Sequence, residues 1–446
     1  MINRSRCLSV LVLLLAAGCA PAANEPASPV TAPSPTFECA VDDGGIALAD
    51  DLCATVFAAD LGRPRHAAVA DNGDLYVARQ AIRRRNPEGE IVIDAPAGVY
   101  ALRDTDGDGV ADQQEAVNEV GETGIALHDG YLYYASTTEI WRVARATEEL
   151  VPTGQPERVV WGFPQQGQHA SKPMTFDDSG NLYVNVGAPS NACQVDMRTP
   201  GSMGEEPCSQ LELQAGIWVY AAGDLEQEHG ADGRRYGTGI RNAMALDWNH
   251  DVSALYALQH GRDSLFDLWG EMFSTEQSAE IPSEEMFRVG DGDDFGWPYC
   301  YHDPNTDQKV LAPEYGGDGV ALGRCADTAP TLLAFPAHWA PNDLHFYRGA
   351  GLPERYRGGA FVAFHGSWNR MPFAQAGYNV VFVPFANGSP SGDYEVVADS
   401  FAAEGEIMSP RDAAHRPTGL AEGPDGSLYI IDDAGGQIWR LRAAGN

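Results

Sequence analysis

The chain has 446 residues, a formal net charge of −34 at pH 7, and an abundance of glycine and proline. So large an acidic excess argues against nucleic acid or anionic lipid as a partner, because like charges oppose the encounter. The ordinary apolar content, 44%, together with the many turn-forming residues, favours a turn-rich globular β protein.

The first 18 residues have the pattern of an export signal. Arg4 and Arg6 precede the apolar run LSVLVLLLAAG, which is too short to be a stable membrane anchor and ends at Cys19. The residues Ala-Ala-Gly-Cys resemble a bacterial lipobox, and the alternative is ordinary cleavage at small residues. We expect residues 1–18 to be a lipoprotein signal peptide, and the protein to be an exported, periplasmic or cell-surface lipoprotein. Its only membrane attachment would be a lipid on Cys19.

Residues 19–37 form a Pro/Ala/Ser tract without periodicity, which predicts a disordered tether ahead of a folded domain over residues 38–446. Without Cys7 and Cys19, six cysteines remain in that domain. An even number in an exported chain suggests disulfides, and the pairs 39/53, 193/208 and 300/325 are the simplest connectivity of many. No Cys-x-x-Cys pair exists, which disfavours zinc.

A turn signal followed by a short apolar and aromatic run recurs six times along the domain. The six phrases are DNGDLYVAR at 71, HDGYLYYAS at 128, DDSGNLYVNVG at 177, VSALYAL at 252, GGAFVAFHG at 358 and GPDGSLYIIDD at 423. Asp/Asn-Gly before alternating β-formers is a hairpin entry. Helical periodicity is missing between them, which predicts an all-β, six-bladed β-propeller with long loop insertions rather than a pair of sandwiches. The widest gap, between the fourth and fifth phrases, predicts an insertion.

The segment DTDGDGVADQQE matches the EF-hand calcium loop position for position. Hard oxygen ligands at this spacing suit calcium, and a structural clamp between blades is favoured over a sensor because a strand replaces the entering helix. An acidic surface loop without metal is the alternative. The expected ligands are Asp104, Asp106, Asp108, the Val110 carbonyl, Asp112 and Glu115. The later acidic stretch GDGDDFG lacks the downstream glutamate and is interpreted as a turn-rich loop.

Basic residues stand just in front of several repeated strands. His169 and Lys172 precede the third phrase, Arg241 precedes the fourth and Arg416 precedes the sixth. Loops of different blades converge on the axis of a propeller, so these cations would gather around an anion. For an isolated histidine, a hydrogen-bonded core role is the simpler interpretation. Among such neighbours, a neutral histidine that accepts a proton is favoured.

Several motifs together resemble the soluble PQQ-dependent sugar dehydrogenases, particularly the sorbosone dehydrogenase-like branch; PQQ is pyrroloquinoline quinone. The resemblance runs from about Asp60 to near the C-terminus. It rests on GQHASKPMTFDDSGNLYVNVGAP, GTGIRNAMALDW, GDDFGWPYCYHD, AHWAPNDLHFYRG, FVAFHGSWNR and RPTGLAEGPDGSLYIIDDAGGQIWR. The resemblance implies a six-bladed propeller that carries PQQ and a calcium ion on its axial face.

The resemblance also implies roles for individual residues. His169 would be the general base that takes the substrate hydroxyl proton while hydride passes to the quinone, and Arg241 would stabilise the quinone oxygen. Asn242 and Arg416 would bind the cofactor. The Gly261 carbonyl would help to hold calcium. The loop with His338 and Trp339 would line the sugar pocket.

Three positions depart from the family pattern. Glu122 or Thr123 stands where glucose-oxidising members have a glutamine against the cofactor, and a glutamate there would repel a tricarboxylate unless it is protonated or bound to calcium. Arg262 replaces a common proline. The cofactor lysine has no clean counterpart; Lys172 is one candidate, and Arg370 and His365 are others.

The sequence therefore predicts a quinoprotein dehydrogenase that oxidises an aldose, a sorbosone-like compound or a related hydroxyl or aldehyde substrate. No haem-attachment Cys-x-x-Cys-His motif exists, so the electron acceptor is expected to be a separate molecule. The alternatives are a calcium-dependent propeller lactonase or esterase, and a non-catalytic propeller that serves as a binding lipoprotein.

Overall fold

The computed structural model describes residues 38–402 and 405–445. The expected signal peptide, the tether and Cys19 lie outside the described residues. No helix in the described part of the chain is long and apolar enough to cross a membrane.

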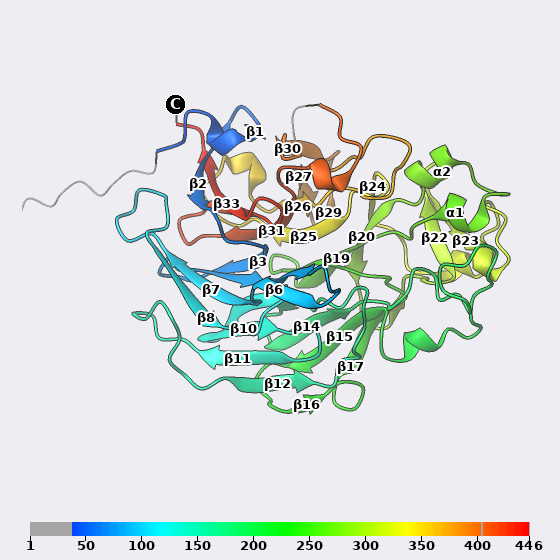
Figure 1. The fold of residues 1–446 in the computed structure, drawn as a ribbon, viewed down its shortest axis with the longest axis horizontal. Coiled ribbons are helices and arrows are strands. Elements are labelled where there is room, and N and C mark those ends of the chain that lie inside the picture. The colour runs from blue at the N-terminus through cyan, green and yellow to red at the C-terminus, as the bar shows by residue number, and fades with distance from the viewer. Residues whose placement is uncertain (1–37, 403–404, 446) are drawn as a thin grey trace, which may run out of the picture. The chain divides into compact units, whose positions relative to one another are not determined.

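Six sheets of four or five strands surround a common axis (Figure 1), which confirms the predicted six-bladed β-propeller. The first strand of each sheet contacts the first strands of its neighbours, so these six strands form the innermost ring. They are β3 (Pro64–Val69), β9 (Ile125–His128), β13 (Met174–Phe176), β18 (Ala245–Asn249), β25 (Pro341–Phe346) and β31 (Pro417–Glu422).

The second strand of every blade coincides with one of the six repeated phrases. These strands are β4 (Leu75–Arg79), β10 (Tyr131–Ala135), β14 (Asn181–Val186), β19 (Ala254–Gln259), β26 (Ala360–Phe364) and β32 (Leu428–Asp432). The turns that lead into five of them contain a glycine with positive φ: Gly73 (89°), Gly130 (78°), Gly180 (80°), Gly358 (78°) and Gly426 (76°). The second strands are almost wholly buried, because six apolar clusters fill the spaces between adjacent blades.

The outer strands complete the blades, and the N-terminal strand β2 closes the ring by pairing with the C-terminal strand β33. The third and fourth strands are β7 (Gly98–Arg103), β8 (Gln113–Asn118), β11 (Ile140–Ala144), β12 (Glu157–Trp161), β15 (Gly216–Ala221), β17 (Arg234–Thr238), β20 (Glu284–Val289), β24 (Leu333–Phe335), β27 (Asn379–Val383), β30 (Glu395–Asp399), β33 (Gln437–Ala443) and β2 (Leu52–Ala58). Short edge strands join three blades: β1 (Ala47–Leu48), β16 (Gln227–Glu228) and β21 (Asp293–Asp294). Strand β21 lies inside GDGDDFG, which was predicted to be a loop.

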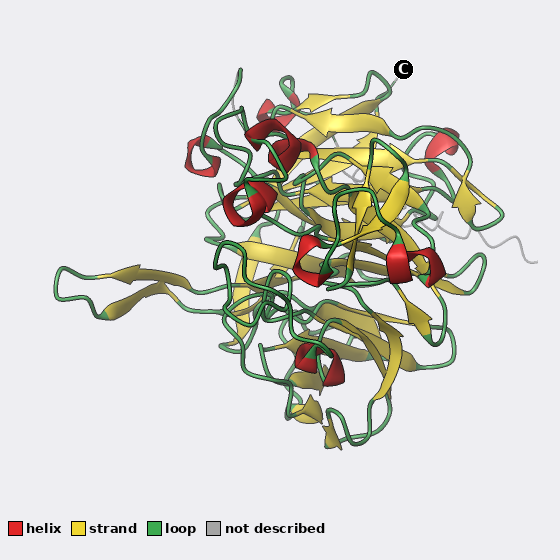
Figure 2. Cartoon of the chain, turned by 90° about the vertical axis from the view of Figure 1, so that its right-hand side faces the viewer, coloured by secondary structure: helices red, strands yellow, loops and turns green. Residues whose placement is uncertain are grey.

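The predicted insertion lies beside the ring in Figure 1. It contains α1 (Leu265–Trp269), α2 (Thr275–Glu280), β22 (Cys300–Asp303) and β23 (Gln308–Leu311), and it has a small apolar core of its own. Strands β5 (Ile82–Arg85) and β6 (Ile91–Ala95) form an arm that stands away from the blade of β3, β4, β7 and β8 (Figure 2). The remaining elements are the pair β28 (Phe385–Ala386) and β29 (Ser389–Pro390), and the 3-10 helices η1 (Asp43–Gly45), η2 (Ser209–Glu212), η3 (Pro313–Tyr315), η4 (Gly323–Asp327), η5 (Glu354–Tyr356) and η6 (Pro410–Asp412).

Disulfides join Cys39 to Cys53, Cys193 to Cys208 and Cys300 to Cys325. The simplest connectivity is thus confirmed. The Cys193–Cys208 bond lies in the long loop between β14 and β15. The Cys300–Cys325 bond connects β22 to the 3-10 helix η4 within the insertion.

Candidate active site

Residues that precede three of the inner strands line one cavity of about 200 Å³. Gln168 and His169 come before β13, Arg241 comes before β18, and His338 and Ala340 come before β25. Segments distant in sequence therefore meet at the end of the axis where the inner strands begin. The remaining wall residues are Arg198, His260, Gly261, Asp263, Glu284, Trp368 and Asn369.

The imidazole of His169 is held with one nitrogen free. Its Nδ1 lies 2.6 Å from the carbonyl oxygen of Ala188, to which it donates, and Nε2 makes no hydrogen bond with any described residue. Burial, and then the positive charge of Arg241, lower the pKa of His169 to about 3, since both disfavour the imidazolium. At neutral pH its Nε2 is an unprotonated acceptor at the cavity wall.

Arg241 is fixed by three acceptors. Its guanidinium donates to Asp263 Oδ2 at 2.8 Å, to Asn191 Oδ1 at 3.1 Å and to the His260 carbonyl at 3.4 Å. Asp263 also accepts from Asn369 Nδ2 at 2.7 Å. Burial acts to raise the pKa of Asp263, but the nearby positive charges, with Arg241 the largest and Arg198 among the others, together outweigh it and lower that pKa, so the carboxylate stays ionised. Asp263 thus fixes the position of the positively charged Arg241 guanidinium at the cavity wall.

The loop after β19 offers free backbone carbonyls. The Gly261 amide donates to Glu284 Oε2 at 2.7 Å, whereas the carbonyls of Gly261 and Arg262 accept no hydrogen bond from the described residues. Carbonyl oxygens are ligands that calcium prefers. Burial raises the pKa of Glu284 to about 8, so this carboxyl group is mainly protonated at neutral pH.

A cluster of three arginines, Arg63, Arg65 and Arg416, adjoins the cavity; we call it the arginine cluster. Arg63 and Arg65 both pair with Asp433, Arg63 at 3.3 Å. Asp433 also accepts from His365 Nε2 at 2.7 Å. Arg416 donates to the His365 carbonyl at 2.9 Å and to the Gly366 carbonyl at 2.8 Å. Two guanidinium groups thus share the Asp433 carboxylate, and the third is held by backbone carbonyls, which leaves an excess of positive charge.

Glu122 lies beside the arginine cluster. Burial raises the pKa of Glu122, while the charges of Arg83, Arg65 and Arg63 oppose that rise. Its carboxylate lies 3.8 Å from Arg83 in the arm. Arg65 is also among the charges that lower the pKa of His260, after burial and Arg241. Arg416 holds the start of the loop that carries Trp368, a residue of the cavity wall, so the arginine cluster and the cavity share that loop.

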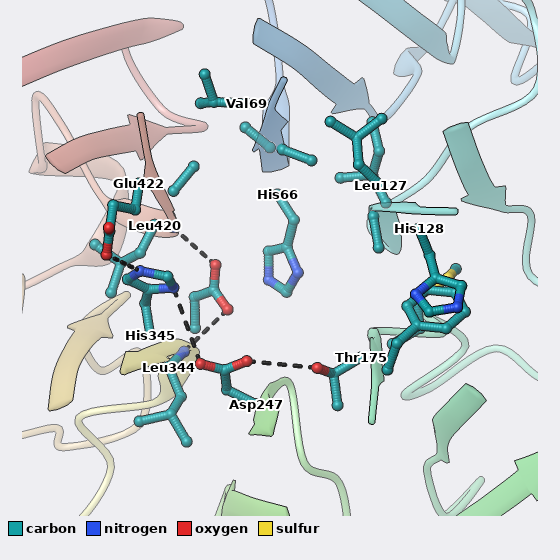
Figure 3. Close-up of a pocket in the computed structure, with 18 of the residues that line it drawn as sticks. His66, Val69, Leu127, His128, Thr175, Asp247, Leu344, His345, Leu420 and Glu422 are labelled. Carbon is teal, nitrogen blue, oxygen red and sulfur yellow. Dashed lines mark hydrogen bonds and ion pairs between the residues drawn. The ribbon is translucent and has the colours of Figure 1, made fainter. Parts of the chain in front are cut away.

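A larger cavity of about 540 Å³ lies where the inner strands end (Figure 3). His345 stands between Glu422, at 3.0 Å, and Asp247, at 3.9 Å. Asp247 of β18 accepts a backbone N–H of β25 at 2.9 Å, and Asp343 of β25 accepts one of β31 at 2.7 Å. These carboxylates join neighbouring blades, so we assign them a structural role and place the candidate active site at the smaller cavity.

A family model described as TrAA12-like matches residues 46–444. The chain belongs to the TrAA12-like family. Membership confirms the resemblance to PQQ-dependent sugar dehydrogenases that the motifs indicated. A curated relative, the pyrroloquinoline quinone-dependent pyranose dehydrogenase of Coprinopsis cinerea, is 27% identical over 239 residues, or 47% of this chain. The match spans only 31% of that relative's length.

Two solved structures resemble this TrAA12-like chain. The holo form of the PQQ domain of the C. cinerea pyranose dehydrogenase has a TM-score of 0.69 at 20% identity, over 93% of this chain and 99% of that one. A Trichoderma reesei enzyme of family AA12 has a TM-score of 0.71 at 19% identity, over 90% of this chain and 98% of that one. At these identities the likeness establishes a shared fold.

Two predicted cofactor residues of the TrAA12-like chain point away from the cavity. Lys172 is fully buried, and its Nζ donates to the Ala170 carbonyl at 2.5 Å. Burial lowers the pKa of Lys172 to about 7. Arg370 donates to the carbonyl of Ala279 at 2.7 Å and pairs with Glu280, both in α2. Each amine or guanidinium is engaged elsewhere, so neither lines the cavity.

Asn242 and Trp339 stand behind the cavity wall. Asn242 Oδ1 accepts from Asn185 at 3.1 Å, and it approaches Gly187 so closely that a Cβ there would lie only 2.6 Å from it. Trp339 packs edge-on against Phe364, with ring centroids 5.3 Å apart. The tryptophan that lines the cavity is Trp368, which is 53% exposed. The sequence motif contained it, in HGSWNR, without showing that its loop turns inward.

The EF-hand-like loop brings three of its predicted ligands together. Ligand oxygens of Asp104, Asp106 and Asp108 all lie within 4.8 Å of one another. Asp112 instead accepts from the amide of the adjacent Thr105 at 2.8 Å. The carboxylates of Asp112 and Glu115 do not belong to that group of side-chain oxygens, and the Val110 carbonyl stays a predicted ligand.

Sequence reasoning missed Arg63, Arg65 and Asp263. A signal for the two arginines was present, because they stand at the start of the first inner strand as Arg416 stands before the last. Asp263 follows the predicted calcium position at Gly261, yet no pattern indicated that its carboxylate meets Arg241. Only the folded loop shows that contact.

Proposed function

We propose that the protein is a quinoprotein dehydrogenase that binds PQQ and calcium at the smaller cavity and oxidises a sugar. The substrate would be an aldose, a sorbosone-like compound or a related hydroxyl or aldehyde compound. The observation that carries this proposal is the free Nε2 of His169 at the wall of a cavity that also contains Arg241 and the free carbonyls of Gly261 and Arg262.

The residues present fit an anionic quinone and a calcium ion. Nε atoms of Arg241 and Arg65 are buried without a hydrogen-bond partner, as is Oδ1 of Asn369. Buried polar atoms are normally paired, so such orphans favour a ligand. The free carbonyls would hold calcium, and the arginine cluster would face the carboxylates of PQQ. Asn242 stays proposed as a cofactor contact, whereas Lys172 and Arg370 would act by packing. Glu122, whose pKa is raised by burial, also stays proposed as a cofactor contact.

PQQ, when bound, supplies a quinone that accepts a hydride from the substrate carbon. His169 Nε2 takes the proton of the substrate hydroxyl, since its other nitrogen already donates to Ala188. Arg241 is preorganised by Asp263 at 2.8 Å and offers positive charge where negative charge develops. A separate electron acceptor would be needed to complete the reaction.

The substrate would lie against Trp368 and His338. Sugars present apolar faces that pack on aromatic rings, and an exposed tryptophan beside polar groups provides such a platform. His338 lines the cavity, and its Nε2 donates to the Ser278 carbonyl at 2.9 Å, which fixes the ring. Trp339, which we expected in this role, supports the wall from behind.

The Asp104 loop is proposed to bind a second calcium ion as a clamp between blades. Asp104 pairs with Arg440 of β33 at 3.1 Å, and the Ala111 amide of the same loop donates to β2 at 2.8 Å. Both partner strands belong to the blade that closes the ring. Export and a lipid on Cys19 also remain proposals, and the three disulfides fit an oxidising compartment.

A calcium lactonase would need carboxylate and amide ligands that are free to surround the metal. Here Asp263 is paired with Arg241, and Glu284 accepts two backbone amides. The arrangement therefore favours an anionic cofactor over a lactonase. A non-catalytic binding protein does not explain a rigidly oriented neutral histidine at the cavity.

The test is reconstitution of the purified protein with PQQ and calcium, followed by dye reduction with a panel of sugars and alcohols. We expect PQQ to bind with calcium and at least one sugar to reduce the dye. Failure to bind PQQ in a titration would exclude the proposal. Hydrolysis of lactones without PQQ would support the lactonase instead.

A further inference from the structure

Arg262 forms a buried ion pair with Glu314, a residue of η3 in the insertion. Its Nη1 and Nη2 donate to the two carboxylate oxygens, at 2.5 and 2.8 Å, and the Trp269 indole donates to the same carboxylate at 2.9 Å. The Arg262 side chain is 4% exposed and the Glu314 side chain is fully buried. A planar fork on a carboxylate fixes direction as well as distance, which a lysine in the same place would not do.

The partners of the pair belong to different parts of the fold. Arg262 lies in the loop after β19, at the cavity, whereas Glu314 and Trp269 belong to the insertion. Beside them, an apolar cluster of Leu265, Phe273, Ile281, Tyr301, Val310 and Ala312 holds the insertion together. The ion pair therefore anchors the cavity loop to a body with its own core.

Both neighbours of Arg262 belong to the candidate site. Gly261 precedes it, with a carbonyl free of hydrogen bonds and an amide held by Glu284 at 2.7 Å. Asp263 follows it and pairs with Arg241 at 2.8 Å. The Asp263 amide donates to Asn191 Oδ1 at 2.8 Å, so both ends of this segment are also held by their amides. With both ends held, an anchored Arg262 side chain restricts the directions that the Gly261 and Arg262 carbonyls can take.

We propose that Arg262 is a positioning residue for the metal: its ion pair with Glu314 aims the loop carbonyls at calcium, so the insertion sets the calcium affinity of the site. The inference rests on the proposed function. It also gives a role to Arg262, which departs from the proline common at this position in the resembling family. Partners that orient metal ligands from outside typically change metal affinity by about 10–100-fold.

The test measures the calcium concentration for half-maximal PQQ binding, followed by PQQ absorbance, together with the melting temperature. In the double variant Arg262→Met/Glu314→Leu, apolar side chains replace both charges, so no charge is left buried and unpaired. The Trp269 indole loses its acceptor, so we expect the melting temperature to fall modestly while the protein stays folded. The calcium midpoint should rise at least tenfold. An unchanged midpoint in a folded double variant overturns the inference.

Arg355 and Asp51 provide the control, since they form another forked pair, at 2.7 and 3.0 Å, in segments that carry no proposed calcium ligand. Arg355→Met/Asp51→Leu should leave the calcium midpoint unchanged, and an equal rise there contradicts a specific role for Arg262. If the first double variant does not fold, Arg262→Lys decides: it keeps the charge but loses the fork, so a raised midpoint supports the inference and a parental one overturns it. Absence of calcium-dependent PQQ binding in the parent contradicts the proposed function itself, and the inference with it.

Discussion

His169 is held by its backbone as well as by its side chain. Its φ is 51°, a region that non-glycine residues seldom occupy, and its carbonyl accepts from Gln166 at 2.9 Å. A Cβ on Gly187 would lie 2.6 Å from the His169 Cβ, so only glycine permits this approach. Unfavourable backbone conformations of this kind persist where the surroundings enforce them, and they cluster at functional sites.

Replacing His169 with alanine should preserve cofactor binding and abolish most turnover. Loss of a general base costs about 10²–10⁴-fold in rate, while the cationic groups that would bind PQQ stay in place. Stopped-flow reduction of bound PQQ by sugar measures the effect. His250→Ala, at the opposite end of the inner strands, is the control and should retain full activity. Turnover that survives in His169→Ala would show that the base is another residue.

Single residues were predictable where they stand before a repeated strand. His169 and Arg241 were recognised because the position of a residue relative to an inner strand fixes its end of the axis. Trp368 was not recognised, since it lies beyond the end of β26 in a loop whose path depends on contacts from other blades. Trp339, which stands just before an inner strand, was expected to line the pocket, yet the cavity is lined by Trp368 and not by Trp339.

At the scale of elements, the loop after β26 depends on Arg416 of another blade. Arg416 donates to the first two carbonyls of that loop, at 2.9 and 2.8 Å, and Ser367 further along donates to Gln375 at 2.8 Å. The loop is thereby closed on itself and presents Trp368 to the cavity. Arg416, which was expected to bind the carboxylates of the cofactor, thus also holds the loop that carries Trp368.

Removal of the Trp368 ring should weaken substrate binding without slowing the chemical step. For Trp368→Ala we expect KM to rise about tenfold, equal to about 1.4 kcal/mol, with kcat nearly unchanged. Steady-state dye reduction measures both constants. The matched control is Phe373→Ala, because Phe373 lies in the same loop and is 38% exposed but does not line the cavity. Equal effects of the two variants would argue against a sugar platform.

The repeated phrases were a reliable guide to elements because each second strand is buried on both faces between two blades. The arm of β5 and β6 was not predicted, because it lies outside the six repeated phrases, although β6 has the strand-forming sequence Ile-Val-Ile-Asp-Ala. The two helices of the insertion are only five and six residues long, too short for a periodic pattern to reveal them.

The Asp104 loop connects β7 to β8, and calcium there should stabilise the fold independently of PQQ. For the parent we expect calcium to raise the melting temperature relative to chelator, because a ligand at 100 times its Kd adds about 2.7 kcal/mol. Asp106→Asn should reduce that rise by several degrees. Its calcium-dependent PQQ binding should remain at the parental level, which separates the two sites. A full calcium response in the variant would exclude the loop as a metal site.

Across the whole molecule, the ring is closed by strands from opposite ends of the chain and by polar contacts around the axis. Strand β2 pairs with β33 from Leu52 opposite Ala443 onward. Near the axis, Asp247 and Asp343 each accept an amide from the next inner strand. Closure of this kind could not be read from one sequence, because it depends on which blades become neighbours and not on any local pattern.

Asp343 should make the stability of the folded ring depend on pH. The pKa of Asp343 is raised to about 8, chiefly by burial and also by the nearby Asp247, while backbone hydrogen bonds from Leu420 and Leu344 oppose the rise. In the unfolded chain the carboxyl group loses its proton near pH 4, whereas the folded protein keeps it until about pH 8. Folding therefore takes up a proton in this window, and stability falls as pH rises through it.

Asp343→Asn should remove that part of the pH dependence. Each unit of pH between 5 and 7 should cost the parent about 1.4 kcal/mol more than the variant, because asparagine cannot titrate. Denaturant unfolding of both proteins at pH 5, 6 and 7 gives the two slopes. The variant also loses one acceptor for an inter-blade amide, but that loss is the same at every pH and cannot change the slope. Exposed Asp393→Asn is the control and should follow the parent. Parallel slopes for Asp343→Asn and the parent would mean that this carboxyl group is already ionised within the ring.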